Sequence, residues 1–514
     1  MAVSEDRKYT GQYVYNLLEG VKGRTLGEVD DVGSRQFART EKSSKITGIA
    51  GDVIEQSVFC YDRDSKQECD IEIDGVLTEL KTTGVRVPKT DLAKVRGKSW
   101  EEYSSYFSAK EGISITGVTF EPSIQRDFAT SHFWEKSERL LIVFYEYASY
   151  DVVPAAAYRD FRIVGYCYNT FSEAEKSQLR SDWEIVRDYL AERYDAYENA
   201  EERNRSLVGF THVLRPQLML IELVPGFKRR NNGSYQRPRY RLKKTFVDHI
   251  VRGHFRGNRE EVSLGHSFSS FAELDARCHA LAELYKGKTL AELKEILGVE
   301  LDISAKNFTS GCIIKMFGAD CKRLNQISDF TKAGIIAKTI TITPSGGRTE
   351  DMKLASVDFS EWTDRDIDFE DSAVYSYFSE HSFLCPVFCE RDKNDASGTT
   401  FEGFKRFAFD EDFLQGEVRR TWQDARNLIH RNQLVLEVQY NKRTGMPILN
   451  NSGGFKAAPN LPKSSAYTVF FRGGAKDSSE ASKTEVVNNI RMLPQFFWLK
   501  GSYITSELEK LPYL

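Results

Sequence analysis

The sequence predicts an α/β protein made of two tandem domains, each a central mixed β-sheet flanked by helices. Two observations lead to this fold class: strand-like and helix-like patterns alternate along the chain, and motifs of the first half return in the second. Segments 74–83, 112–120 and 139–147 have the pattern of strands, the last of them buried. Segments 11–22, 173–198 and 279–297 have the 3.6-residue spacing of helices.

The internal repeat rests on motifs in the same order. Lys22–Glu28 and Lys286–Glu292 share five of seven residues, and Trp183 and Trp422 are expected as core anchors of corresponding helices. Three further pairs are each 257 positions apart: Lys81 and Lys338, Arg215 and Arg472, Lys243 and Lys500. A common offset is typical of duplication, so we expect one domain at 1–258 and a second at 270–514.

A chemically suggestive hairpin lies at residues 69–83. Apolar and acidic residues alternate from Asp70, Gly75 permits a tight turn, and alternation resumes through Lys81. Glu79 and Lys81 are two residues apart, so they share a strand face, and Asp70 can reach the same end of the hairpin. Metal-dependent nucleases use this arrangement, in which carboxylates hold Mg²⁺ and a lysine orients or deprotonates water. The alternative is an exposed strand with alternating charges.

The second copy lacks these acids. Alignment places Ile336 opposite Glu79 and Lys315 opposite Glu55. Ile327 falls opposite Asp70, although Asp329 is close by. A site without carboxylates cannot hold Mg²⁺, so the second domain is predicted to be catalytically silent.

A strongly basic stretch runs from Lys228 to Arg259. It contains eleven Lys and Arg residues and one acid, Asp248, interleaved with amide and aromatic side chains. A solvated loop and helix end would also explain it, but contact with a phosphate backbone is the favoured interpretation.

Composition places the chain among ordinary globular proteins. Its 514 residues are 40% hydrophobic and 28% charged, with a net charge of −4. No apolar run approaches the roughly 20 residues of a membrane span, and the first residues lack a secretory apolar region, so we expect a cytoplasmic protein. Cys385, Cys389 and His381 lack the spacing of a zinc site and are expected as free thiols and an ordinary histidine. His132, His249 and His254 likewise match no metal motif.

The ordered motifs resemble the mismatch-repair endonuclease MutH and its two-domain restriction-enzyme relatives that cut at GATC. The resemblance follows the first half through Lys22–Glu28, Gly51–Glu55 and Asp70–Lys81. It continues through residues 131–141, 182–184, 214–216 and 240–246, and the second half resembles the C-terminal domain of the restriction enzymes. It implies restriction-endonuclease-like domains.

The resemblance also implies roles for individual residues. Asp70, Glu79 and Glu55 would ligate Mg²⁺, Lys81 would activate water, and Lys136 would support the site or the scissile phosphate. Residues implied in DNA binding are Arg215, Pro216 and Gln217 for the bases, and Arg239, Arg241, Lys243, Lys244, Arg472 and Lys500 elsewhere.

Three departures from the family pattern leave alternatives open. The spacing from Asp70 to Glu79 is longer than usual, so Glu72 and Asp74 are rival ligands. Gln217 replaces a basic residue, and Arg241 replaces an aromatic residue linked to methylation sensing, so no response to adenine methylation is implied.

The function expected is Mg²⁺-dependent cleavage of double-stranded DNA at GATC by a type II restriction endonuclease. Because GATC is palindromic and one chain has one active site, we expect a DNA-induced homodimer or two sequential nicks. The silent domain is expected to bind a second GATC as an allosteric effector. The alternatives are a strand-nicking endonuclease of mismatch repair and a non-catalytic DNA-binding protein.

Overall fold

The computed structural model describes most of the chain. The described residues are 7–42, 46, 48–61, 68–120, 126–150, 153–199, 202–203, 206–207, 210–224, 237–257, 261–264, 267–347, 350–359, 361–363, 365, 367–392, 394–441, 443–450 and 454–514. Within these ranges, every helix is too short or too polar to cross a bilayer.

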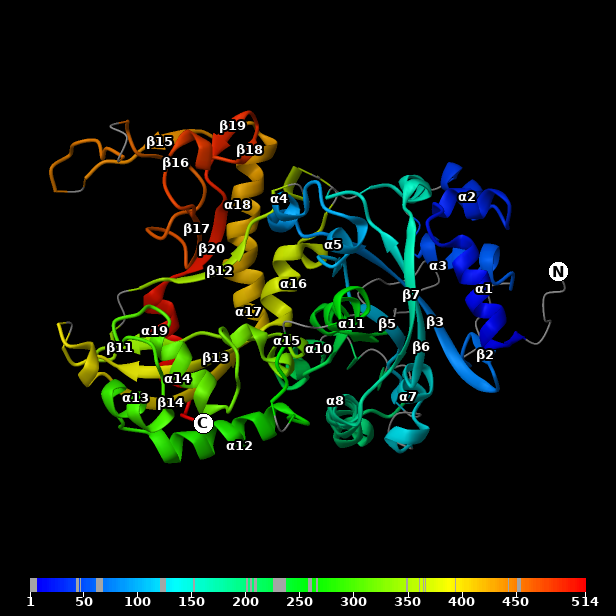
Figure 1. Ribbon diagram of the computed structural model, residues 1–514, viewed down its shortest axis with the longest axis horizontal. Helices are drawn as coiled ribbons and strands as arrows, with labels where there is room; N and C mark the ends of the chain where they lie inside the picture. The colour runs from blue at the N-terminus through cyan, green and yellow to red at the C-terminus, as the bar shows by residue number, and fades with distance from the viewer. Residues whose placement is uncertain are drawn as a thin grey trace. The chain divides into compact units, whose positions relative to one another are not determined.

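The chain forms two compact units. Unit 1 contains residues 1–276 together with 317–336, and unit 2 contains 277–316 and 337–514. Figure 1 follows the chain from the blue strands and helices of unit 1 to the orange and red elements of unit 2. These units are groups of residues that contact one another in space. The domain limits 1–258 and 270–514, which were drawn from the sequence repeat, stay a prediction.

Unit 1 is built on a mixed sheet in the order β1-β2-β3-β6-β7, with β4 paired to β3. β1 runs parallel to β2 and β3 runs parallel to β6, while β2 runs antiparallel to β3 and β7 antiparallel to β6. The strands are β1 (Lys8–Tyr9), β2 (Ile71–Ile73), β3 (Val76–Arg86), β4 (Ser108–Ala109), β6 (Arg139–Glu146) and β7 (Ile163–Thr170). The predicted strands at 74–83 and 139–147 are confirmed as β3 and β6.

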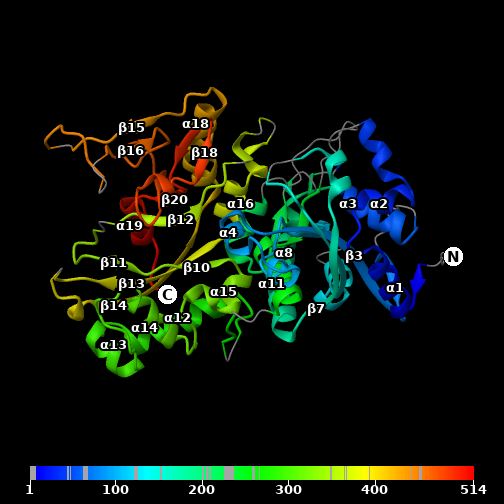
Figure 2. The same cartoon turned by 45° about the horizontal axis from the view of Figure 1, so that its top comes forward.

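The two faces of this sheet are covered by different helices. Leu80 of β3 and Leu141, Val143 and Tyr145 of β6 share a core with α1, α2 and α3, which lie together in both views (Figures 1 and 2). Phe144 points the other way and packs on Phe255 of α11, with ring centroids 5.5 Å apart. Helices of unit 1 are α1 (Gly11–Val21), α2 (Leu26–Asp31), α3 (Ile49–Val53), α4 (Leu92–Val95), α5 (Trp100–Ser104), α7 (His132–Ser137), α8 (Glu173–Arg193), α10 (Phe210–Leu214), α11 (Lys244–Arg256) and α15 (Ser328–Lys332).

A second, three-stranded sheet completes unit 1, in the order β5-β9-β8. Its strands are β5 (Ile113–Gly117), β8 (Ile221–Val224) and β9 (Arg239–Leu242), so the strand predicted at 112–120 is confirmed. The carboxylate of Asp182 in α8 accepts three backbone hydrogen bonds, from Met219, Leu220 and Ile221, at 2.7–2.9 Å. This buried side chain therefore fixes the segment that enters β8.

Unit 2 repeats both sheets with changes. β13 (Ser382–Cys389) pairs in parallel with β11 (Ile340–Ile342) and antiparallel with β14 (Thr400–Ala408). A three-stranded sheet in the order β12-β20-β17 corresponds to β5-β9-β8. The remaining strands are β10 (Ile335–Ala337), β12 (Met352–Ser356), β15 (Leu436–Val438), β16 (Ala457–Pro459), β17 (Val469–Gly473), β18 (Glu485–Val487), β19 (Ile490–Met492) and β20 (Gln495–Leu499).

The helices also correspond between the units. Trp183 of α8 and Trp422 of α18 are both buried, as predicted for core anchors. Helices in or entering unit 2 are α12 (Phe271–Tyr285), α13 (Leu290–Leu297), α14 (Phe308–Met316), α16 (Ala373–Glu380), α17 (Glu411–Phe413), α18 (Arg419–His430) and α19 (Gly501–Lys510).

The shared Lys-Gly motif forms a turn between two helices in each unit. Gly23 and Gly287 have φ of 85° and 77°, a left-handed conformation that ends the preceding helix. Thr25 and Thr289 then cap α2 and α13. Each threonine hydroxyl oxygen accepts the backbone N–H of the glutamate three residues on, and the carboxylate of that glutamate accepts the backbone N–H of the threonine. The single helix predicted at 279–297 is therefore wrong, because Gly287 and the Thr289 cap divide it into α12 and α13.

Candidate active site

Two lysines hold the buried carboxylate of Glu79. Lys81, two residues along β3, donates to Oε1 of Glu79 at 2.6 Å. Lys136 of α7 donates to Oε1 and Oε2 at 3.1 and 3.0 Å. Only 2% of Glu79 is exposed, so its charge is balanced by two ammonium groups within a largely desolvated environment. The acid and both lysines predicted from the sequence are thus brought together.

Asp70 lies at the entrance to the hairpin, beside this cluster. Its Oδ2 accepts the backbone N–H of Leu80 at 2.9 Å, which places the carboxylate against β3 between Glu79 and Lys81. Burial raises the pKa of Asp70, and the charge of Glu79 raises it further, whereas Lys81 and Lys136 lower it. Two carboxylates that act on each other in this way form a site that favours a cation.

The two rival ligands, Glu72 and Asp74, bind other partners. Both oxygens of Asp74 accept the backbone N–H of Gly11 at 3.0 Å, so this side chain caps α1. Glu72 lies opposite Lys8 across the β1–β2 pair and forms an ion pair with it at 3.3 Å. Asp74 and Gly75 form the two-residue turn with φ of 49° and 80°. The geometry therefore favours Asp70 over Glu72 and Asp74 as the partner of Glu79.

Glu55 occupies a π-helical turn, Ile54–Val58, that continues α3. A π turn inserts one residue into the helical register and redirects the side chains around it, which is common at functional sites. Glu55 acts electrostatically on both Lys81 and Tyr61. The corresponding helix of unit 2, α14, is a regular α-helix and has Lys315 in the aligned position.

The donors fit a hard divalent cation, although they are not yet gathered around one point. Among the described residues, no three His, Cys, Asp or Glu side chains stand close enough together to hold a metal. Carboxylate oxygens are nevertheless the ligands that Mg²⁺ prefers. The ammonium groups of Lys81 and Lys136 already contact the Glu79 oxygens, so a cation there would have to compete with them.

The electrostatics of Lys81 reflect the same acids. Burial by itself lowers the pKa of Lys81, but the negative charges of Glu79, Asp70 and Glu55 outweigh it, and the net pKa is raised. Lys81 is therefore an ammonium group in this state.

The residues predicted to contact DNA have different surroundings. Arg239 and Arg241 lie on β9; Arg239 is exposed, and Arg241 pairs with Glu222 at 2.6 Å. Lys244 pairs with Asp248 at 2.9 Å. Lys243 is 2% exposed and donates to the carbonyl oxygen of Leu218 at 2.6 Å. Its position does not support the predicted phosphate contact, because its ammonium group is engaged in the core.

The segment predicted to read bases forms a short 3₁₀ helix, Arg215–Gln217, ahead of β8. Arg215 contacts Nδ1 of His212 at 2.7 Å. Of the basic stretch, Lys228, Arg229, Arg230 and Arg259 lie outside the described residues.

Strand registers revise one pair of the repeat. Ile221 and Val469 lie opposite Leu242 and Leu499, so Arg472 corresponds to Val224 and not to Arg215. Lys243 and Lys500 do correspond, since each immediately precedes a helix that follows the central strand of its sheet.

Unit 2 retains the lysine position without the acids. Lys81 lies opposite Ile142, the fourth residue of β6. The backbone N–H of Lys338 bonds to Leu384 at 2.9 Å, which places Lys338 beside Cys385, the fourth residue of β13. Asp329, the nearby acid, belongs to α15 in unit 1, where it pairs with Lys332 at 3.9 Å. The structure thus provides unit 2 with no equivalent of the Asp70–Glu79 pair within the residues described.

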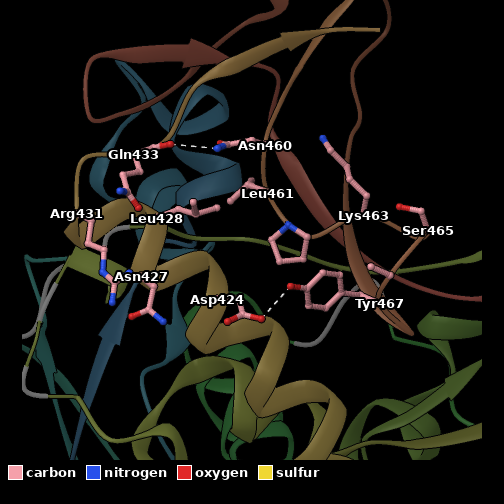
Figure 3. Close-up of a pocket in the computed structure, with 12 residues that line it drawn as sticks. Asp424, Asn427, Leu428, Arg431, Gln433, Asn460, Leu461, Lys463, Ser465 and Tyr467 are labelled. Carbon is pink, nitrogen blue, oxygen red and sulfur yellow. Dashed lines mark hydrogen bonds between the residues drawn. The ribbon is translucent and has the colours of Figure 1, made fainter. Parts of the chain in front are cut away.

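Unit 2 has a polar pocket of a different kind, with a volume of about 450 Å³. Asp424 and Asn427 of α18, with Arg431 directly after that helix, face Lys463 and Tyr467 across it (Figure 3). The hydroxyl of Tyr467 donates to Asp424 at 2.8 Å. With this single carboxylate already hydrogen-bonded, the pocket does not reproduce the acid–lysine cluster of unit 1.

His249 and His254 contact residues outside the acid–lysine cluster. His249 pairs with Glu261 at 2.8 Å, and the ring of His254 packs on Phe144 at 5.1 Å. The eight cysteines, among them the buried Cys385 and Cys389, are free thiols as predicted. Tyr61 was not among the predicted site residues, because no alternation or motif marks it in the sequence. Only its position after the π turn brings it near the acids.

Two comparisons with known proteins agree with this geometry. The family model described as DNA mismatch repair enzyme MutH matches residues 59–182, which include Asp70, Glu79, Lys81 and Lys136. The type II restriction enzyme Sau3AI of Staphylococcus aureus is 22% identical over 528 residues, covering 98% of this chain and 99% of that protein. These similarities support a MutH-like type II restriction endonuclease. Its MutH-like segment contains four of the five predicted catalytic residues, and Glu55 lies just ahead of it.

Proposed function

We propose that this protein is a Mg²⁺-dependent type II endonuclease that cleaves double-stranded DNA at GATC. The observation that carries the proposal is the Glu79 carboxylate held between Lys81 and Lys136, with Asp70 beside it, inside the MutH-like segment. Ionisable groups that shift one another's pKa values in this way are gathered at functional sites in many enzymes.

Asp70 and Glu79, with Glu55 from the π turn, would hold the cation. When bound, Mg²⁺ supplies a Lewis acid for the phosphate oxygens. Lys81 would orient the attacking water. To accept a proton from that water, its ammonium group would first have to release its own proton to solvent, which becomes easier when a bound cation offsets the charge of the acids that raise its pKa. Lys136 keeps Glu79 in position through both carboxylate oxygens, and its ammonium group is available to the scissile phosphate.

Unit 1 would bind the duplex through its second sheet and the segments around it. Arg239 and Arg241 project from β9, and Arg215, Pro216 and Gln217 lie ahead of β8. Guanidinium groups suit both phosphate contacts and the major-groove edge of guanine.

Unit 2 would bind a second GATC and act as an effector. Its three-stranded sheet matches that of unit 1, and it presents Arg472 on β17 with Lys500 at the start of α19. Arg472 also lies over the ring of Trp498, 4.4 Å from its centroid. Two chains brought together on DNA as a homodimer would then cut the two strands of one palindrome.

Digestion of a sequenced plasmid with and without Mg²⁺, followed by mapping of the cut ends, tests the proposal. Uniform ends at GATC that require Mg²⁺ are expected. Open circles alone would instead support a strand-nicking repair enzyme, which the mismatch-repair description of the matching family also suggests. Ends at another sequence would reject the GATC assignment and keep the nuclease.

A further inference from the structure

Tyr61 places a buried hydroxyl group without a partner beside the predicted nuclease site. The residue is 7% exposed and packs in the core beneath β3. Its hydroxyl oxygen has no hydrogen-bond partner in the part of the chain that the structure describes. Buried polar groups are nearly always hydrogen-bonded, so an exception calls for a functional explanation or a missing ligand.

The backbone fixes where this hydroxyl group lies. The N–H of Tyr61 bonds to the carbonyl oxygen of Glu55 at 3.2 Å, directly after the π turn that carries that acid. The guanidinium group of Arg7 packs over the ring, 4.5 Å from its centroid. The ring is therefore held from two sides.

The surrounding charges determine the chemical form of the group. Burial raises the pKa of Tyr61, and the carboxylates of Asp70, Glu55 and Glu79 raise it further, against a smaller opposing effect of Arg7. The phenol thus stays protonated and can donate a hydrogen bond. The three acids that act on it are the predicted metal ligands.

We propose that Tyr61 is a positioning residue of the nuclease site, whose hydroxyl group donates a hydrogen bond to a water molecule that enters with the cation. This inference rests on the proposed function. Among the residues that the structure describes the donor has no partner, and the cluster of acids beside it is where a hydrated cation would add an acceptor.

Tyr9 provides a matched control for this proposal. It belongs to the same core, but its hydroxyl group donates to the carbonyl oxygen of Phe59 at 3.1 Å. Tyr9→Phe therefore removes an existing hydrogen bond, whereas Tyr61→Phe removes a donor that makes no hydrogen bond within the described ranges. Both variants keep the aromatic ring.

Full-length wild type, Tyr61→Phe and Tyr9→Phe would be compared in three measurements. Calorimetric titration with Mg²⁺ alone reports cation affinity, plasmid cleavage over a Mg²⁺ series reports the concentration giving half-maximal rate, and thermal unfolding in EDTA reports stability. For Tyr61→Phe we expect about fivefold weaker Mg²⁺ binding, which corresponds to the loss of one hydrogen bond. The Mg²⁺ concentration that gives the half-maximal cleavage rate should rise by the same factor. In EDTA its Tm should be unchanged or higher, whereas Tyr9→Phe should lower Tm and leave Mg²⁺ affinity unchanged.

The outcomes separate this inference from the proposed function. If the wild type binds Mg²⁺ and cleaves DNA, but Tyr61→Phe binds Mg²⁺ equally well, the role of Tyr61 is rejected alone. A lower Tm of Tyr61→Phe in EDTA would show that the hydroxyl group serves the fold, and would also reject it. If the wild type neither binds Mg²⁺ nor cleaves DNA, both proposals fall.

Discussion

The ammonium group of Lys136 donates to both carboxylate oxygens of Glu79, at 3.1 and 3.0 Å. The contact joins α7 to β3, between side chains that are only 12% and 2% exposed. It ties the strand that carries the predicted catalytic residues to a helix 57 residues further along the chain.

Replacing Lys136 with Met should destabilise the metal-free protein. Glu79 would keep Lys81 but lose the donor that contacts both of its oxygens, and a buried acid short of a partner costs about 1–3 kcal/mol. Urea unfolding in EDTA measures the change. The control is Lys98→Met, since Lys98 pairs at 3.0 Å with the exposed Glu102, and a loss within about 0.5 kcal/mol is expected there. Equal losses in the two variants would contradict the prediction.

Replacing Lys81 with Ala should abolish cleavage and spare DNA binding. General acid–base groups contribute about 10²–10⁴-fold to rate, and the single-turnover rate should fall by that order. Binding would be followed by gel shift with Ca²⁺ in place of Mg²⁺. Lys338→Ala is the matched control, because Lys338 holds the corresponding strand position in unit 2 but lacks the acids. A Lys81→Ala enzyme that cleaved within a few-fold of wild type would exclude Lys81 from the chemistry.

At low enzyme concentration, a plasmid with two GATC sites should be cut faster than one with a single site. Arg472→Ala should remove that advantage and leave the one-site rate unchanged, because Arg472 lies in unit 2, away from the predicted catalytic residues of unit 1. The fold should be kept, since Arg472 is exposed and its partner Asp351 still accepts the N–H of Gly501 at 3.1 Å. Arg443→Ala, which changes another exposed arginine of unit 2, should keep the two-site preference. Equal rates on the two plasmids with wild type would refute the effector role.

The stability of unit 1 should depend on pH through Asp182. Burial raises the pKa of this carboxyl group to about 6, against the opposing effect of three backbone N–H donors. The folded state therefore binds a proton more tightly than the unfolded state, whose value is near 4. The contribution of this proton to the free energy of unfolding is fully present below about pH 4 and is lost as the pH rises to about 6. Above that pH, Asp182 no longer makes the stability depend on pH.

Denaturant unfolding of wild type and Asp182→Asn between pH 4.5 and 8 tests this dependence. The variant cannot titrate at this position, so its stability relative to wild type should improve by about 2 kcal/mol as the pH rises across this range. A difference that is flat across this range would mean that Asp182 is already ionised at its low end.

The local pattern of the hairpin was sufficient to predict much of the site. Alternation about Gly75 predicted β2 and β3, and period two placed Glu79 and Lys81 on one face. It could not choose among Asp70, Glu72 and Asp74, because all three alternate along the same strand. The choice depends on Gly11 and Lys8, which engage Asp74 and Glu72 from a neighbouring helix and strand.

The surroundings of Lys243 do not support the predicted phosphate contact. In sequence it stands within a basic stretch, and only the fold shows that its ammonium group turns inward to the carbonyl oxygen of Leu218. The motif Lys286–Glu292 was also recognised as a repeat. The helix predicted across it did not allow for the left-handed Gly287 and the Thr289 cap, which divide that helix into two.

By itself, the sequence determined the α/β class, the strands β3 and β6, the acid–lysine pattern on β3 and the loss of acids in the second copy. Each of these features depends only on residue type and on spacing within a short segment. Tertiary structure decided which acid joins Glu79, how Lys136 reaches it, and where Tyr61 and Lys243 place their polar groups. These depend on contacts between segments far apart in the chain, whose register, burial and electrostatics no local pattern contains.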